Sequence, residues 1–235
     1  MARTKKSPAR SENGRAEDRV FNAILDAVLD HRLPPGTKLK ERELAEIFGA
    51  SRATVRAALT RLGHNLLVEL RPNRGAVIAN PTPAETRELF EARRVVEAAL
   101  VQRLAGSLKA KQLAELRAFV AEETRAYERG DDKDGKRLSI RFHKLLSEMA
   151  GNATLDRFLE NLICRTPLLA LARNGRVAYC GAQEHRQIVD ALARRDAAAA
   201  AKCMGVHLHN LERMLMPQPA EEARPPTLAA ALAAP

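Results

Sequence analysis

The chain has 235 residues, of which 46% are hydrophobic and 29% charged, as in a globular protein with two small domains. No apolar run approaches the roughly 20 residues that span a bilayer. The basic N-terminus lacks the apolar stretch of a signal peptide, so we expect a cytoplasmic protein with no membrane partner. Three widely spaced cysteines indicate reduced thiols rather than a disulfide framework or a zinc–cysteine cluster.

The net charge of +10 is unevenly distributed along the chain. Residues 1–80 hold 15 Lys and Arg against 9 Asp and Glu, whereas residues 81–235 hold 24 against 20. The basic excess of the shorter segment favours a polyanionic partner such as DNA. A basic surface can also serve solubility alone, so charge does not decide between the two interpretations.

The N-terminal part is predicted to contain a tail and three helices. Residues 1–15 are basic and almost free of apolar side chains, which predicts a disordered tail. Residues 17–31 repeat apolar side chains at helical spacing, and a Leu-Pro-Pro-Gly turn follows. A second helix is predicted over residues 41–48, ending at Gly49, which suits a left-handed turn. Ser51 is expected to cap the third helix with its hydroxyl.

Two short helices joined by a glycine turn, with cations leading the second, are typical of a helix-turn-helix that enters the DNA major groove. Arg52 and Arg56 lie four residues apart and can pair with guanine, while Thr54 can meet a phosphate or a thymine methyl group. Apolar segments 68–70 and 76–79 flank a basic tip and predict a hairpin wing. The predicted DNA-contacting residues are Arg42, Ser51, Arg52, Thr54, Arg56, Arg74 and Gly75.

A second domain is predicted to begin at Thr82, Pro83 and Glu85, which have the sequence of a capping box before a long helix. Ser107 is expected to cap the next helix, and no convincing strand follows. The fold class is therefore mainly α: an N-terminal winged helix-turn-helix followed by an all-helical bundle of about six helices. The predicted boundaries are a disordered basic tail over 1–15, a winged helix-turn-helix DNA-binding domain over 16–80, a helical effector-binding and dimerisation domain over 81–216, and a disordered tail over 217–235.

Four residues of the helical domain are candidates for binding chemistry. His143, His185 and His207 fall on three predicted helices. Imidazoles that converge in a bundle core can bind zinc or a similar transition ion, whereas scattered histidines are more often surface or satisfied core groups. Arg93 lies among apolar neighbours and needs an anionic partner, which is either Glu97 one turn on or the carboxylate of a ligand.

The N-terminal segments resemble the DNA-binding domain of GntR-family transcriptional regulators over about 60 residues. The matching segments are residues 33–39, 41–45, 51–59 and 71–75. The resemblance implies operator contacts for Arg42, Arg52, Thr54, Arg56 and Gly75. At Leu66 the chain departs from the family, which usually has a glycine there.

The helical part is similar to the FCD-type effector domain of the FadR-like branch. Many members hold a divalent metal with three His and one Asp, the Asp four residues before the first His. The resemblance implies that His143, His185 and His207 bind a divalent transition metal such as zinc. It also implies an effector site lined by Arg93, Ser139 and the three histidines. Ser139 stands at the Asp position, and its hydroxyl is a poor ligand without charge.

The predicted function is a ligand-responsive, sequence-specific DNA-binding transcriptional regulator, a repressor, that binds an inverted repeat of double-stranded DNA as a homodimer. The resemblance implies a small organic acid, a carboxylate, as effector. We expect no enzyme, since the sequence has no phosphate-binding loop, nucleophile elbow or HExxH motif. Two alternatives stay open: a metal-dependent enzyme that carries a DNA-binding domain, and a constitutive DNA-binding protein whose bundle only dimerises.

Overall fold

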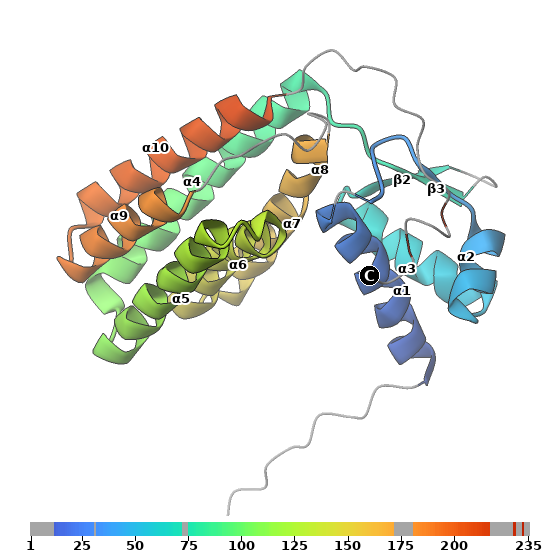
Figure 1. Ribbon diagram of the computed structural model, residues 1–235, viewed down its shortest axis with the longest axis horizontal. Helices are drawn as coiled ribbons and strands as arrows, with labels where there is room; N and C mark the ends of the chain where they lie inside the picture. Colours follow the sequence, from blue (N-terminus) through green and yellow to red (C-terminus); the bar gives the residue numbers. More distant parts are fainter. Residues whose placement is uncertain are drawn as a thin grey trace, which may run out of the picture. The chain divides into compact units, whose positions relative to one another are not determined.

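The computed structural model describes residues 12–30, 32–71, 75–171 and 181–216, with the isolated positions 228 and 232. Two compact units are present, one built around the chain up to Ala79 and the other formed by Asn80–Glu222 (Figure 1). No helix within the described ranges is long and apolar enough to cross a membrane. The fold class predicted from the sequence is confirmed: a small helix-and-hairpin unit precedes a helical bundle.

Among its described residues, the first unit combines three helices with a three-stranded antiparallel sheet in the order β1-β3-β2. Its elements are α1 (Glu12–Leu29), β1 (Lys38–Leu39), α2 (Glu41–Phe48), α3 (Arg52–His64), β2 (Val68–Arg71) and β3 (Gly75–Ile78). The predicted hairpin is present, with Glu69 opposite Val77. The predicted tip includes residues 72–74, which lie outside the described residues.

The sheet also contains a strand that the sequence did not reveal. Lys38 and Leu39 of β1 pair with Val77 and Ala76 of β3. Two residues are too short for an alternating pattern, so only the pairing defines this strand. Helix α1 begins at Glu12, inside the segment predicted as a disordered tail. The prediction missed this start because the first turn of the helix is polar and carries no apolar repeat.

The core of the first unit lies where α1 packs on α3. Val20 and Ile24 of α1 and Val55 and Leu62 of α3 are buried. At the edge of this contact the guanidinium of Arg61 donates to the Asp18 carboxylate at 2.7 Å. The apolar face of α3 is therefore committed to the core, and its opposite face stays exposed.

The second unit is a bundle of seven helices within the described residues, one more than the approximate six predicted. Its helices are α4 (Pro83–Ser107), α5 (Ala110–Glu128), α6 (Asp132–Ala150), α7 (Ala153–Cys164), α8 (Thr166–Leu171), α9 (Ala182–Ala193) and α10 (Ala197–Leu215). The short helix α8 accounts for the difference, since the break near Pro167 separates it from α7. The turn predicted at 174–175 and nearly all of the predicted tail over 217–235 lie outside the described residues.

Caps define the start of α4 and the junction with α5. Thr82 accepts a hydrogen bond from the Glu85 backbone N–H at 3.2 Å and Glu85 accepts from the Thr82 N–H at 2.8 Å, so the predicted capping box is present. Ser107 was wrongly predicted to cap the next helix. Its hydroxyl donates to the Arg103 carbonyl at 2.9 Å and prolongs α4, and α5 follows Lys109 instead.

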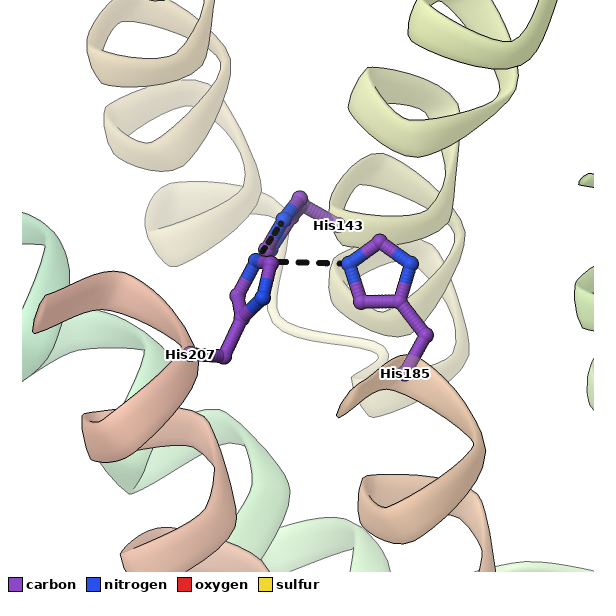
Figure 2. A group of neighbouring side chains, drawn as sticks. All are labelled: His143, His185 and His207. Carbon is purple, nitrogen blue, oxygen red and sulfur yellow. Dashed lines mark hydrogen bonds between the residues drawn. The ribbon is translucent and has the colours of Figure 1, made fainter. Parts of the chain in front are cut away.

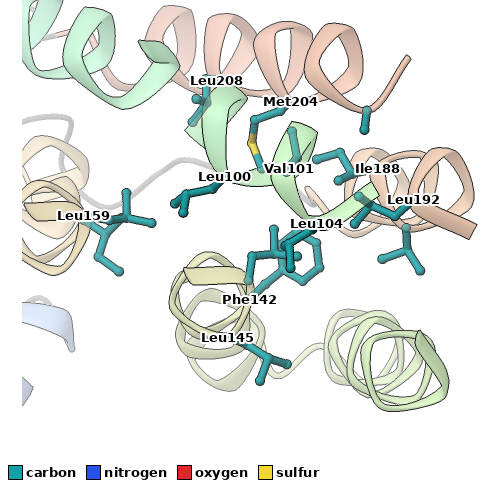
Figure 3. Close-up of a cluster of buried hydrophobic side chains, with 14 of the residues drawn as sticks. Leu100, Val101, Leu104, Phe142, Leu145, Leu159, Ile188, Leu192, Met204 and Leu208 are labelled. Atoms are coloured by element: carbon teal, nitrogen blue, oxygen red, sulfur yellow. The ribbon is translucent and has the colours of Figure 1, made fainter. Parts of the chain in front are cut away.

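The bundle core gathers buried apolar side chains from all seven described helices of this unit, and Figure 3 shows part of it. Leu104 of α4, Phe142 of α6, Ile188 of α9 and Met204 of α10 lie together, and Leu159 of α7 belongs to the same buried cluster. Burial of each such side chain contributes about 1.5–3 kcal/mol. This packing holds α6, α9 and α10 in the register that brings their histidines together.

Candidate functional sites

Helices α2 and α3 are joined by the tight turn that the sequence predicts. Gly49 adopts a left-handed conformation with φ 56° and ends α2. Ser51 then begins α3, and its hydroxyl accepts from the Thr54 backbone N–H at 3.1 Å. Because both ends of the turn are capped, the angle between the two helices is defined locally.

The predicted DNA-contacting residues divide into exposed and buried groups. Arg42, Ser51, Arg52 and Arg56 are exposed, whereas Thr54 is buried and its hydroxyl hydrogen-bonds that of Ser51 at 2.8 Å. Thr54 therefore serves the helix start in this state. Arg52 has no hydrogen bond or ion pair within the described part of the chain, so its guanidinium is available for a partner.

Glu41 holds Arg56 in place. The Arg56 guanidinium donates twice to this carboxylate, from Nε at 2.9 Å and from an Nη at 2.7 Å. The hydrogen bond from Arg56 lowers the pKa of the Glu41 carboxyl, despite the opposing effect of burial. The sequence did not predict this pair, because its members lie 15 positions apart on different helices.

Gly75 has a role within its own unit. It has φ 80°, and a Cβ at this position would collide with the backbone carbonyl oxygen of Leu39. The close approach of β1 to β3 therefore requires glycine here. Arg74, the other predicted wing contact, lies outside the described residues.

A second candidate site lies in the bundle, where three histidines converge (Figure 2). His143 of α6, His185 of α9 and His207 of α10 are all buried, and one ring nitrogen of each lies within 4.8 Å of the others. The Nε2 atom of His207 is 3.2 Å from that of His143 and 3.3 Å from that of His185. Phe142 stacks on the ring of His185 and closes one side.

A carboxylate holds the outer nitrogen of each ring. Glu97 of α4 contacts Nδ1 of His143. Glu123 of α5 lies 2.7 Å from Nδ1 of His185, and Glu184 of α9 lies 2.8 Å from Nδ1 of His207. An Nδ1–H that donates to a carboxylate leaves the Nε2 lone pair free, and this arrangement is typical of metal-ligating histidines.

The electrostatics of the cluster favour neutral imidazoles. Burial lowers the pKa of His143 to about 3 and that of His185 well below 6.5. Burial alone would raise the pKa of the Glu97 carboxyl, but Arg93 and His143 outweigh it and lower the value to about 2. Burial raises the pKa of Glu123 to about 7, against the opposing effects of His143, His207 and Ser139.

The donor set fits a divalent transition metal. With Nδ1 protonated on every ring, three Nε2 lone pairs face one another without a proton between them, and a cation would satisfy all three. Tetrahedral zinc with Zn–N bonds of about 2.0–2.1 Å places neighbouring ligand nitrogens roughly 3.3–3.4 Å apart. The two Nε2 separations of 3.2 and 3.3 Å are close to this value.

Arg93 and Ser139 flank the cluster. Arg93 is buried, and its guanidinium donates to Glu97 at 2.8 Å and to the Thr166 hydroxyl at 3.1 Å. Of the two partners considered from the sequence, the contact with Glu97 is present, and the contact with a ligand carboxylate stays a prediction. Ser139 is half-buried on α6, one turn before His143, and interacts with the Glu123 carboxylate.

Sequence reasoning missed Glu123 altogether. A signal was present, since Leu116, Val120 and Glu123 follow one another at helical spacing and place a carboxylate on the buried face of α5. An acidic residue in an apolar stripe is rarely buried without a partner. The partners, however, come from α6 and α9.

Comparison with known proteins assigns both units to families. Residues 16–78 match the model described as bacterial regulatory proteins, gntR family, and residues 88–210 match the FCD domain. The chain is 27% identical over 202 residues to the HTH-type transcriptional repressor RspR of Escherichia coli K12, which spans 82% of this chain and 85% of RspR.

Two solved structures share the fold. A putative GntR transcriptional regulator from Rhodococcus sp. RHA1 is 25% identical, with a TM-score of 0.73 over 88% of this chain and 98% of that one. E. coli McbR/YncC superposes with a TM-score of 0.76 at 20% identity, over 88% and 98% of the two chains. The chain therefore belongs to the GntR family of bacterial regulatory proteins, in the group whose second domain is an FCD domain.

Proposed function

We propose that this protein is a ligand-responsive transcriptional repressor that binds an inverted-repeat operator as a homodimer. The unit over residues 16–80 would bind DNA, and the bundle over residues 81–216 would dimerise and bind the effector. The observation that carries the proposal is the exposed basic start of α3, where Arg52 makes no hydrogen bond or ion pair with the described residues and Arg56 is oriented by Glu41. Two such helices about 34–36 Å apart fit successive major grooves.

DNA contact by this surface would divide the work among its residues. Arg52 and Arg56 would pair with guanine edges, and Arg42 and Ser51 would meet phosphates. Thr54 would act through the shape of the helix start, because its hydroxyl is bound to that of Ser51. We keep Arg74 and Gly75 in the wing contact as part of the proposal, with Gly75 also required by its contact with Leu39.

The bundle would supply the trigger. His143, His185 and His207 would hold a divalent transition metal such as zinc, a Lewis acid that attracts the carboxylate of a small organic acid. Ser139 would line the effector site, and Arg93 would position His143 through Glu97. The relative RspR, 85% of which is covered by the alignment with this chain, is named a repressor, and this supports the proposed sign of regulation.

The test is a fluorescence anisotropy titration on DNA selected from a random library by the purified protein. Arg52→Ala should weaken binding to the selected site by about 1–3 kcal/mol and relax base preference. Arg117→Ala, an exposed arginine of α5, is the matched control and should change neither. Equal affinity of the Arg52 variant for selected and scrambled DNA supports the proposal, and an unchanged footprint contradicts it.

Effector response is measured in the same assay with a panel of small carboxylic acids. A coupling of about 1–3 kcal/mol between effector and operator is the expected size. Release of the DNA by one of the acids supports repression with induction. Operator binding that no acid changes would favour the constitutive alternative.

A further inference from the structure

The charge around the three histidines is unbalanced once a metal is considered. Three neutral imidazoles donate lone pairs but no negative charge, so a divalent cation would bring two positive charges into a buried region. An uncompensated charge in a protein interior is costly. The cluster therefore needs an anion among the residues that surround it.

The three carboxylates at the cluster differ in how far other groups or solvent already compensate their negative charge. Glu97 is already paired with the buried guanidinium of Arg93 at 2.8 Å. Glu184 is partly exposed, at 19%, and accepts a second hydrogen bond from Asn210 at 2.6 Å. Glu123 is fully buried, and within the described residues no lysine or arginine contacts it.

One carboxylate oxygen of Glu123 also lacks a hydrogen-bond partner among the described residues. Its Oε2 is bound to His185, but its Oε1 is buried and has no hydrogen-bond partner among the described residues. A buried carboxylate oxygen without a partner costs free energy in the protein as it stands. A nearby cation, or a metal-bound water that donates to Oε1, would remove that cost.

We propose that Glu123 of α5 is the anionic counterpart of the metal held by His143, His185 and His207, and that it acts from outside the ligand set through His185. The inference rests on the metal site proposed above. Glu123 is not among the groups whose ligand atoms all lie within 4.8 Å, so it is a positioning residue and not a ligand. Its charge would neutralise the cation, and its Oε1 would be available to accept a hydrogen bond from a metal-bound water.

The first test replaces Glu123 by glutamine and titrates the chelated full-length protein with Co²⁺. The amide oxygen of Glu123→Gln still accepts from His185 Nδ1, so the variant removes the charge and keeps the hydrogen bond. Co²⁺ affinity should fall about 10- to 100-fold, the loss typical of an outer-shell partner. The visible Co²⁺ spectrum should keep its shape, because the three ligands are unchanged.

A second readout separates this role from a merely structural one. The melting temperature of the chelated Glu123→Gln protein should stay level or rise, because a buried carboxylate whose Oε1 has no hydrogen-bond partner among the described residues has been removed. A structural carboxylate would give the opposite sign. Glu184→Gln is the matched control: it changes the same group beside His207, but at a partly exposed position, and should weaken Co²⁺ binding less.

Rescue by a charge at another position completes the experiment. Ser139 interacts with Glu123 from one turn before His143, so Ser139→Asp places a carboxylate beside the same cluster. It should restore Co²⁺ affinity in the Glu123→Gln background and add less to the wild-type protein, which gives a coupling in the double-mutant cycle. If Glu123→Gln does not fold, a large gain from Ser139→Asp in the wild-type protein contradicts the inference, and a small gain supports it.

The outcomes distinguish this inference from the proposed function. Unchanged Co²⁺ affinity in folded Glu123→Gln overturns the role of Glu123 and leaves the metal site standing. Binding by Ser139→Asp but not by the wild-type protein overturns it as well, because Glu123 then fails to supply the charge. If neither protein binds Co²⁺, the metal site fails together with the inference, while the DNA titration still decides the regulatory function.

Discussion

Leu66 lies just after α3, beyond the C-cap Asn65, and adopts the left-handed backbone region with φ 54°. Its N–H donates to the Gly63 carbonyl at 2.9 Å and the N–H of Leu67 donates to the Leu62 carbonyl at 3.1 Å, the two hydrogen bonds of a Schellman motif. Glycine meets this conformation without strain. The side chain is 50% exposed, so the fold gains little from its burial. Leucine at this position therefore strains the backbone, and burial of its side chain offsets little of that cost.

Leu66→Gly should stabilise the first unit. Relief of the left-handed strain contributes about 1 kcal/mol, reduced by the greater freedom of glycine in the unfolded chain. Urea denaturation followed by circular dichroism measures the change. Leu70→Gly is the control, an equally exposed leucine in β2 at 48%, and should destabilise. A Leu66→Gly protein that is less stable than the wild type would contradict the strain argument.

Glu41→Gln should reduce the sequence specificity of DNA binding. Without the carboxylate, Arg56 loses the two hydrogen bonds that orient its guanidinium. Affinity for scrambled DNA should rise, since a negative charge near the phosphates is removed, and the ratio of specific to nonspecific affinity should fall. Anisotropy titrations on both DNAs at one salt concentration measure the ratio. Glu46→Gln is the control. Glu46 lies on the same helix, one turn after Arg42, and its carboxylate is 3.8 Å from the Arg42 guanidinium, a looser contact than that between Glu41 and Arg56.

At the scale of elements, the sheet of the first unit depends on one close approach. β1 and β3 pair through Leu39 and Ala76, and Gly75 at the start of β3 faces the Leu39 carbonyl. No side chain fits between these two backbones. The pairing thereby holds the wing against the segment between α1 and α2. Helix α2 begins at Glu41, two residues after β1 ends at Leu39.

Gly75→Ala should destabilise the first unit by more than about 1 kcal/mol, because it adds a backbone collision to the strain of a positive φ. Gly49→Ala is the matched control: its φ is 56°, but a Cβ there meets nothing within 4 Å, so it adds strain alone. Chemical denaturation of the two variants compares the terms. Equal losses would show that the contact with Leu39 contributes nothing.

At the scale of the whole molecule, the buried histidines couple stability to pH. Unfolding returns His143 from a pKa of about 3, and His185 from well below 6.5, to about 6.5. Below pH 6.5 the unfolded chain therefore binds more protons, and stability falls as pH falls. Glu123, whose pKa is raised to about 7, has the opposite effect between pH 7 and 4.5, because there the folded state binds the extra proton. One such carboxyl offsets only part of the effect of the two histidines.

The chelated protein should thus lose about 1 kcal/mol of unfolding free energy between pH 6.5 and 5.5, the effect of roughly one net proton. Urea denaturation at several pH values measures it. His143→Gln should flatten the dependence, because it removes one of the two groups that gain a proton on unfolding. A wild-type stability that does not change over this interval would contradict the assignment of neutral imidazoles.

The local signals of this protein can be predicted from its sequence. Gly49, Ser51 and the Thr82–Glu85 capping box act over at most four residues, and each is present as expected. Helix ends depend on more than neighbouring residues: the Ser107 hydroxyl can cap the next helix or bond to the preceding turn, and in the fold it bonds to the Arg103 carbonyl. The three histidines were identified as candidates because they fall on three predicted helices and match the family resemblance, whereas their convergence depends on tertiary packing.

Sequence alone thus determined the two-part architecture, the capped turn before α3 and its basic start, since periodicity and capping depend on neighbouring residues. Tertiary structure decided the rest. It buried Thr54, placed Glu41 against Arg56, and set one carboxylate behind each histidine, with Glu123 as the member that no motif indicated. The Glu41–Arg56 pair and the three carboxylate–histidine pairs join residues 15 to 62 positions apart. Only the packing of α4, α5, α6, α9 and α10 around one core brings the cluster together.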